Sequence, residues 1–100
     1  MAKQFRVRIT EEAIEDLDRL YRYIIGDGVS RAGKFIGELK KKIGDLRKFP
    51  RRGARFRLIA DSEVRFLSYR GYLVFYEIEN NNIFILHITG PGQDWMSLFL

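Results

Sequence analysis

Hydrophobic and polar positions divide the chain into a helical first half and a second half of strands. Residues 5–9 alternate apolar and basic side chains, the pattern of a half-buried strand. Thr10 follows as a predicted helix N-cap, because apolar residues then recur at helical spacing up to Ile25. The run Gly26-Asp27-Gly28 predicts the end of this helix, since glycine readily adopts the positive φ of a C-cap.

A second amphipathic helix is predicted to begin at Ser30 and to stop at Pro50. The short glycine-containing loop between the two helices predicts an antiparallel helical hairpin. On the outer face of the first helix, we expect ion pairs one turn apart at Glu15–Arg19 and Asp18–Arg22.

From Arg55 onward the apolar period changes to two. Strands are predicted at 56–60, 64–69, 72–79 and 83–89, and the turn Asn80-Asn81-Asn82 is a hairpin signal. The order of elements predicts an α+β fold: an N-terminal strand, an antiparallel helical hairpin, then an antiparallel meander. These strands should form one twisted antiparallel sheet with the hairpin packed on one face. We expect a single domain over residues 1–100, because no composition shift marks a second one.

Composition narrows the chemistry. The chain has no cysteine and a single histidine, which excludes disulfides and thiolate ligands and makes a structural zinc site unlikely, so we expect no metal and no cofactor. No apolar stretch approaches the ~20 residues needed to span a bilayer. The N-terminus has no signal-peptide core. We therefore expect a cytoplasmic protein without membrane contact.

Positive charge is concentrated in one region. Between Lys40 and Arg57 there are nine basic residues and one acid, Asp45, in a chain of net charge +5. Such a cluster favours a polyanion or an acidic protein as partner. The alternative interpretation is a solvated helix face that runs into a loop.

His87 is the residue that first suggests an active site. In a regular strand, Leu86 and Ile88 share one face, while Ile85, His87 and Thr89 share the other, more polar face. We therefore expect His87 to face solvent or a partner. No orienting carboxylate lies near it in sequence, so it is a weak catalytic signal.

The ordered set of motifs resembles the RelE/ParE toxin superfamily over nearly the whole chain. The motifs are A-I-E-D-L-D-R-L-Y-R-Y-I (13–24), F-I-x-x-L-x-x-x-I-x-x-L-x-x-F-P (35–50) with R-x-G after it, V-R-F-L (64–67), Y-L-V-F-Y-E-I-E (72–79) and I-x-I-L-x-I (83–88). The members are toxins of bacterial type II toxin–antitoxin systems. The resemblance therefore implies a toxin that a cognate, ParD-like antitoxin neutralises in a hetero-oligomeric complex.

Two departures argue against a RelE-like nuclease: the first matches the ParE-like branch, whereas the second departs from the ParE-like pattern as well. The position of the nuclease arginine in Y-R-L-V-Y is Leu73 here, so a cation for the developing phosphorane charge is missing. ParE-like proteins commonly end the last strand with His-Gly-x-Arg-Asp, and here Gly90, Pro91 and Gln93 occupy the His, Gly and Arg positions. The resemblance then implies inhibition or poisoning of DNA gyrase without catalysis.

The residues expected to contact the target are basic residues before and within the strands, together with the C-terminal tail. They are Lys48, Arg51, Arg52, Arg55, Arg57, Arg65, Asp94, Trp95, Leu98 and Phe99. Two of them have structural alternatives. Arg65 would form a strand salt bridge with Glu77 or Glu79, and Trp95 would pack the tail over the open side of the sheet.

The resemblance also implies an antitoxin segment that lies along the helical hairpin. The candidate receiving residues are Leu17, Leu20, Tyr21, Ile24, Phe35 and Leu39, most of which must also serve the core. Two other functions stay open. One is a ribosome-dependent mRNA endonuclease, for which the candidate catalytic residues are Arg55, Arg57, Arg65, Tyr76 and His87. The other is a non-toxic relative that only binds an antitoxin.

Overall fold

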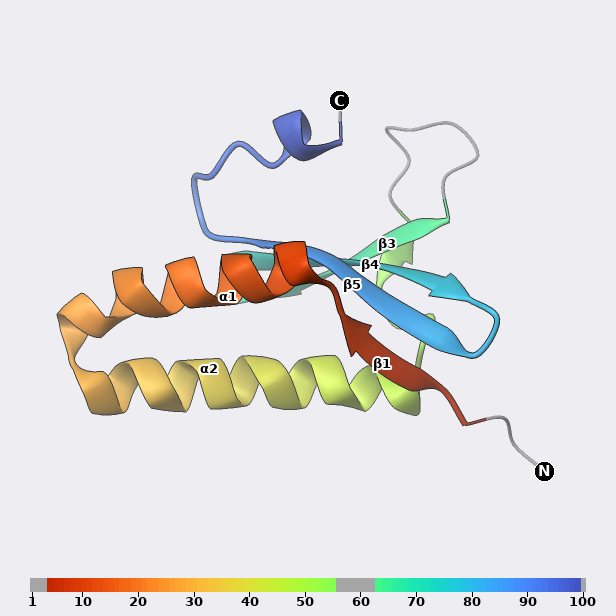
Figure 1. Cartoon of the computed structure of the whole chain (residues 1–100), viewed down its shortest axis with the longest axis horizontal. Helices are drawn as coiled ribbons and strands as arrows, with labels where there is room; N and C mark the ends of the chain where they lie inside the picture. Colours follow the sequence, from red (N-terminus) through yellow and green to blue (C-terminus); the bar gives the residue numbers. More distant parts are fainter. Residues whose placement is uncertain (1–3, 56–62, 100) are drawn as a thin grey trace.

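The computed structural model describes residues 4–55 and 63–99 and has the predicted order of elements (Figure 1). The N-terminal strand, two helices and strand meander of the expected α+β fold are confirmed. The elements are β1 (Arg6–Ile9), α1 (Glu11–Ile24), α2 (Val29–Gly44), β2 (Ala54–Arg55), β3 (Val64–Tyr69), β4 (Tyr72–Glu79) and β5 (Asn82–Thr89), with short 3-10 turns at Ile25–Asp27, Asp45–Arg47 and Met96–Leu98. Arg57 and the predicted strand at 56–60 lie outside the described residues.

The sheet is mixed, with strand order β1-β5-β4-β3-β2. β1 pairs in parallel with β5, from Arg6 opposite Asn82 to Ile9 opposite Ile85, whereas the other neighbouring pairs are antiparallel. The expectation of an entirely antiparallel sheet is therefore wrong at this one pair. Alternation of apolar and polar residues identifies a strand but does not specify which strand pairs with it or in which direction.

Both helices begin close to their predicted residues. The Thr10 side chain accepts a hydrogen bond from the Ala13 amide at 3.2 Å, which confirms the N-cap of α1. Gly28, at φ 121°, supplies the backbone conformation that separates the helices, and α2 begins at Val29 rather than Ser30. α2 ends at Gly44, earlier than Pro50 requires, because the chain tightens into a 3-10 turn.

The two faces of the sheet carry different cores. Buried side chains of α1, α2 and the sheet form the larger core on one face, where Leu39, Leu46 and Ile83 are 0% exposed. Burying each such side chain contributes roughly 1.5–3 kcal/mol. On the other face, Val64 and Phe75 are covered by side chains that include Trp95 and Phe99. Figure 1 shows α2 and the C-terminal tail on opposite sides of the sheet.

A bulge shifts the faces of β5. Phe75 pairs with His87 but the next residue, Tyr76, pairs with Ile85, so Leu86 is an extra residue in β5. Ile85 and Ile88 consequently both lie in the helix-side core, while Leu86 packs near Phe75 on the opposite face. The predicted grouping of Ile85 with His87, and of Leu86 with Ile88, is therefore wrong, because the bulge interrupts the strict period of two.

Candidate functional site

The basic turn, residues 48–52, forms a surface hollow of about 510 Å³. The Arg52 amide donates to the Phe49 carbonyl at 3.1 Å, which closes a β-turn with Pro50 in its second position. Proline at that position fixes φ at the value the turn needs. The lining residues are Lys48, Phe49, Pro50, Arg51 and Arg52, and the basic ones among them are predicted target-binding residues.

A buried tyrosine fixes the basic turn to the sheet. The Tyr76 hydroxyl donates to the Pro50 carbonyl and accepts from the Gly53 amide, both at 2.8 Å. Tyr76 is 0% exposed, and burial raises the pKa of its hydroxyl above the ordinary value. Gly53 must be glycine at this point, because a Cβ there would lie 2.6 Å from the Phe66 carbonyl oxygen and 2.7 Å from the Tyr76 hydroxyl.

Arg65 fixes the same turn from the neighbouring strand. Its Nη1 donates to the Gly53 carbonyl at 2.8 Å and to the Arg51 carbonyl at 3.4 Å. The alternative expectation of a salt bridge with Glu77 or Glu79 is wrong, because within residues 4–55 and 63–99 the guanidinium makes no ion pair. Arg65 therefore supports the basic turn.

Arg55 lies at the end of β2 and is exposed. The Arg55 guanidinium lies 3.6 Å from the Glu63 carboxylate, with both side chains largely exposed. Such exposed pairs contribute little to stability. Arg57 lies outside the described residues.

His87 has a carboxylate partner, contrary to expectation. Its Nδ1 lies 3.1 Å from Oδ2 of Asp16 on α1, and the same oxygen accepts a hydrogen bond from the Ile88 amide at 2.9 Å. The Arg19 guanidinium lies 3.3 Å from the other oxygen of Asp16, in place of the predicted pair with Glu15. The predicted pair Asp18–Arg22 is confirmed at 2.6 Å.

The position of Asp16 follows from the sheet topology. β1 pairs with β5 only as far as Ile85, so the backbone of β5 beyond that point needs another partner. The Ile85 carbonyl accepts two hydrogen bonds from Thr10, one from its amide at 3.2 Å and one from its hydroxyl at 2.7 Å. The Ile88 amide donates to the Asp16 carboxylate. Asp16 is an acidic residue within the apolar stripe of α1, and this position in the sequence could have indicated a buried carboxylate. Asp16 is 5% exposed.

The candidate nuclease residues fall into two groups. Tyr76 and Arg65 are bound to the turn before β2, and Tyr76 belongs to the helix-side core. His87 instead contacts Asp16 and the Phe99 ring, which lies nearly perpendicular to the imidazole and packs on the opposite face of the sheet. No interaction among the described residues joins the imidazole to the Tyr76 hydroxyl or the Arg65 guanidinium.

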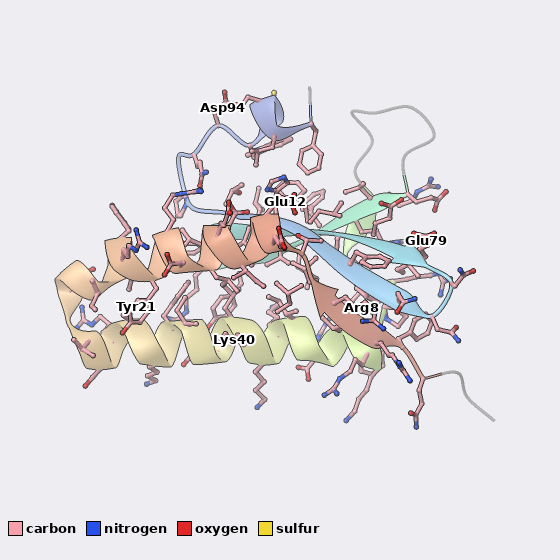
Figure 2. The ribbon with its side chains drawn as sticks, viewed as in Figure 1. Arg8, Glu12, Tyr21, Lys40, Glu79 and Asp94 are labelled. Atoms are coloured by element: carbon pink, nitrogen blue, oxygen red, sulfur yellow. The ribbon has the colours of Figure 1, made fainter. Side chains whose placement is uncertain are left out.

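The C-terminal tail, residues 90–99, packs over the open face of the sheet. The ring of Phe75 lies 5.7 Å from that of Trp95 and 4.9 Å from that of Phe99, centroid to centroid. The alternative expectation for Trp95 is therefore confirmed. Asp94 is exposed, as Figure 2 shows. Leu98 is 38% exposed, so both of these predicted target-binding residues face solvent.

The predicted antitoxin-binding residues are mostly core residues with a narrow exposed edge. Leu17, Leu20 and Ile24 are each 8–9% exposed and Leu39 is 0% exposed, so Leu39 supports the surface without reaching it. Tyr21 and Phe35 are half-buried. Figure 2 shows Tyr21 between the two helices.

A groove of about 470 Å³ runs between α1 and α2. Ile14, 54% exposed, lines it, and a Cβ added at Gly33 or Gly37 would meet nothing within 4 Å. The lining residues are Ile9, Ile14, Leu17, Asp18, Tyr21, Gly33, Ile36, Gly37 and Lys40. Two of the predicted antitoxin-binding residues, Leu17 and Tyr21, thus line an open apolar groove.

The described residues contain no group of three or more His, Asp or Glu side chains that could hold a metal ion. None of the helices in this part of the chain is both long and apolar enough to cross a membrane.

Comparison with known proteins identifies the fold. The family model described as "ParE toxin of type II toxin-antitoxin system, parDE" matches residues 7–95. No curated protein sequence matches the chain.

Three solved structures are similar. The chromosomal ParDE toxin–antitoxin system of P. aeruginosa superposes with a TM-score of 0.76 at 22% identity, covering 90% of this chain and 99% of that one. The toxin–antitoxin complex RelBE2 of Mycobacterium tuberculosis gives 0.59 at 24% identity, covering 87% and 98%. A double mutant of the E. coli toxin RelE in the free state gives 0.61 at 17% identity, covering 87% and 83%. At these identities the structures show a common fold.

Proposed function

The chain belongs to the ParE toxin family of type II toxin–antitoxin systems, and on this premise we propose that it inhibits or poisons DNA gyrase in the cytoplasm. It does so without catalysis of its own, and a ParD-like antitoxin neutralises it. The observation that carries the proposal is the family match over residues 7–95. The basic turn and the tail are its candidate contacts with gyrase.

The interactions of the candidate nuclease residues favour gyrase inhibition over mRNA cleavage. Cleavage by a 2′-hydroxyl needs cations around the phosphorane and a group that transfers a proton. The Tyr76 hydroxyl is buried and bonded to two backbone groups, and Arg65 is bonded to backbone carbonyls. Leu73 replaces the arginine of the nuclease motif, so β4 supplies no cation there.

A ribosome-dependent nuclease is the second candidate, and the Asp16–His87 pair is the observation that favours it. A carboxylate that contacts one imidazole nitrogen orients the ring and selects its tautomer, as general bases require. The argument against a nuclease is that no interaction among the described residues joins this pair to Arg65 or Tyr76.

Gyrase supercoiling in vitro and induction in a sensitive bacterium separate the two functions. We expect purified toxin to inhibit supercoiling, and induced cells to filament with a DNA-damage response. His87→Ala should leave this toxicity unchanged, whereas His87 would be required for a nuclease. Immediate arrest of translation with new messenger 5′ ends, and untouched supercoiling, would contradict the proposal. No effect in either assay would indicate a non-toxic antitoxin-binding relative.

The groove between α1 and α2 is the proposed antitoxin site. Its apolar lining and its open glycines suit the apolar face of a partner helix, which can approach closely where no side chain intervenes. Net charge +5 on the toxin would favour an acidic antitoxin segment.

Filling the groove tests this site. Gly37→Leu projects a side chain into open space on α2, so the fold should tolerate it while the antitoxin helix is excluded. We expect the variant to stay toxic and to resist neutralisation by the co-expressed antitoxin. Gly26→Leu, also in open space but outside the groove, is the matched control and should be neutralised normally. Equal neutralisation of both variants would place the antitoxin elsewhere.

A further inference from the structure

The basic turn is rigid although its side chains are exposed. Tyr76 and Arg65 together bond to the Pro50, Arg51 and Gly53 backbone, and the sheet beneath Gly53 leaves no space for a Cβ. A surface whose backbone is already fixed loses little conformational entropy when a ligand binds. The backbone of the turn is therefore already in place for a ligand before it binds.

The exposed groups of this turn combine an aromatic ring with cations. Phe49 is 61% exposed and lies in the same hollow as Lys48, Arg51 and Arg52. Among the residues that the structure describes, none of these three cations forms an ion pair. An exposed ring on a rigid turn gains little from folding, and it provides a flat apolar face beside several positive charges.

We propose that the basic turn binds a single-stranded polynucleotide, with an unpaired base stacked on Phe49 and flanking phosphates on Arg51 and Arg52. Stacking platforms set in a positively charged groove are the general means of holding single strands, since every base has a π-face. A duplex hides its bases in the stack and would use only the cations. An acidic peptide would likewise use the cations but gain nothing from a bare aromatic ring. The inference goes beyond gyrase inhibition, because it assigns a nucleic-acid ligand to the toxin itself.

Fluorescence anisotropy of the purified full chain tests the site without gyrase, so its outcome is independent of the supercoiling assay. The probes are labelled oligonucleotides of mixed sequence, as single-stranded DNA, single-stranded RNA and duplex DNA of equal length. We expect a single strand to bind more tightly than the duplex. Phe49→Leu, which keeps an apolar side chain but removes the π-face, should weaken single-strand binding about 5-fold or more. Phe49→Tyr should restore it.

The cations have their own measurement, the salt dependence of binding. Arg51→Gln with Arg52→Gln should reduce the slope of log K against log salt by about 1.4 for a single strand, at roughly 0.7 per phosphate contact. Lys34→Gln with Lys41→Gln removes the same charge from exposed positions of α2 and is the matched control, with little change in slope. Stronger binding of the DNA or of the RNA strand identifies which polymer is the ligand.

Three results would overturn the proposal. They are tighter binding of the duplex than of either strand, equal loss of binding in the α2 control, and a Phe49→Leu variant that binds like the parent. Complete competition by polyglutamate with no effect of Phe49→Leu would indicate an acidic protein ligand in place of a nucleic acid.

Discussion

The basic turn and the C-terminal tail are both predicted to contact the target, but they are attached to the sheet in different ways. The turn is joined through directional hydrogen bonds to a buried hydroxyl and to a guanidinium. The tail rests on Phe75 through the faces and edges of Trp95 and Phe99. The attachment of the turn depends on hydrogen-bond geometry, whereas that of the tail depends on buried apolar area.

The difference predicts different responses to mutation. Hydrogen bonds to buried groups are lost completely when one partner is removed, and the remaining group then pays its full desolvation cost. Apolar packing falls in proportion to the area exposed. We therefore expect the turn to be sensitive to single atoms and the tail to tolerate partial truncation.

Gly53→Ala should have the largest effect. The added Cβ would lie 2.6 Å from a backbone oxygen, Phe66 O, which cannot move aside as a flexible side chain would. We expect the free energy of unfolding in urea to fall by about 2–3 kcal/mol. Gly37→Ala is the control with the opposite sign, since its Cβ meets nothing within 4 Å and alanine should stabilise the helix by about 0.8 kcal/mol. Similar stability of the two variants would show that the turn is not tightly packed.

Tyr76→Phe comes next. The ring still fills the core, but the Pro50 carbonyl and the Gly53 amide lose their shared partner. We expect a loss of about 2 kcal/mol in the same urea experiment. Amide hydrogen exchange at Gly53 should also accelerate, while exchange within β5 should be little changed. Unaltered exchange at Gly53 would mean that Arg65 alone fixes the turn.

Asp16→Ala tests the point where β5 leads into the tail. The Ile88 amide loses its acceptor and His87 loses its carboxylate, and we expect a cost of about 1.5 kcal/mol. Asp16→Asn keeps an oxygen that can accept from Ile88, so it should recover most of that loss. If the two variants are equally unstable, the contact with His87 matters more than the contact with the backbone.

Trp95→Ala should cost less, about 1 kcal/mol, because it uncovers part of one ring on a face that Phe99 still covers. Equilibrium unfolding gives the value. A loss above that for Tyr76→Phe would reverse the ranking of the two attachments.

The smallest expected effect is that of alkaline pH on the turn. Burial raises the pKa of Tyr76 above its ordinary value of 10.0, so the fold favours the neutral hydroxyl. The resulting stability is complete below pH ~10 and is lost as the pH rises through the higher folded pKa. Between neutral pH and about pH 10.5, the free energy of unfolding of the parent protein should fall by up to about 0.8 kcal/mol more than that of the Tyr76→Phe variant. Parallel pH profiles for the two proteins would contradict this.

The sequence predicted features that depend on neighbours along the chain. The cap at Thr10 and the strands at 64–69 and 72–79 match the structure, because capping and alternation are local patterns. The contact between Asp16 and His87 was missed because it joins residues 71 positions apart. It exists because the pairing of β1 with β5 ends at Ile9 and Ile85, and beyond that point Asp16 of α1 accepts a hydrogen bond from the β5 backbone.

The sequence predicted which residues make up the candidate site better than it predicted how they are held in place. The cluster of cations before β2 was evident from charge alone, but nothing in the local pattern indicated that Tyr76 and Arg65 would support it from below. The bulge at Leu86 was also invisible, since a run of apolar residues gives no sign of an extra one.

The parallel pairing of β1 with β5 has a consequence for synthesis of the chain. Thr10 and Ile85, which bond to each other, are 75 positions apart, so β1 remains unpaired while the residues between them are translated. Contacts of such long sequence separation form late and slow the folding of small domains. Because β5 lies between β1 and β4 in the sheet, the helical hairpin acquires its full support only after β5 has left the ribosome. A nascent chain should therefore lack the complete toxin surface until β5 has been translated.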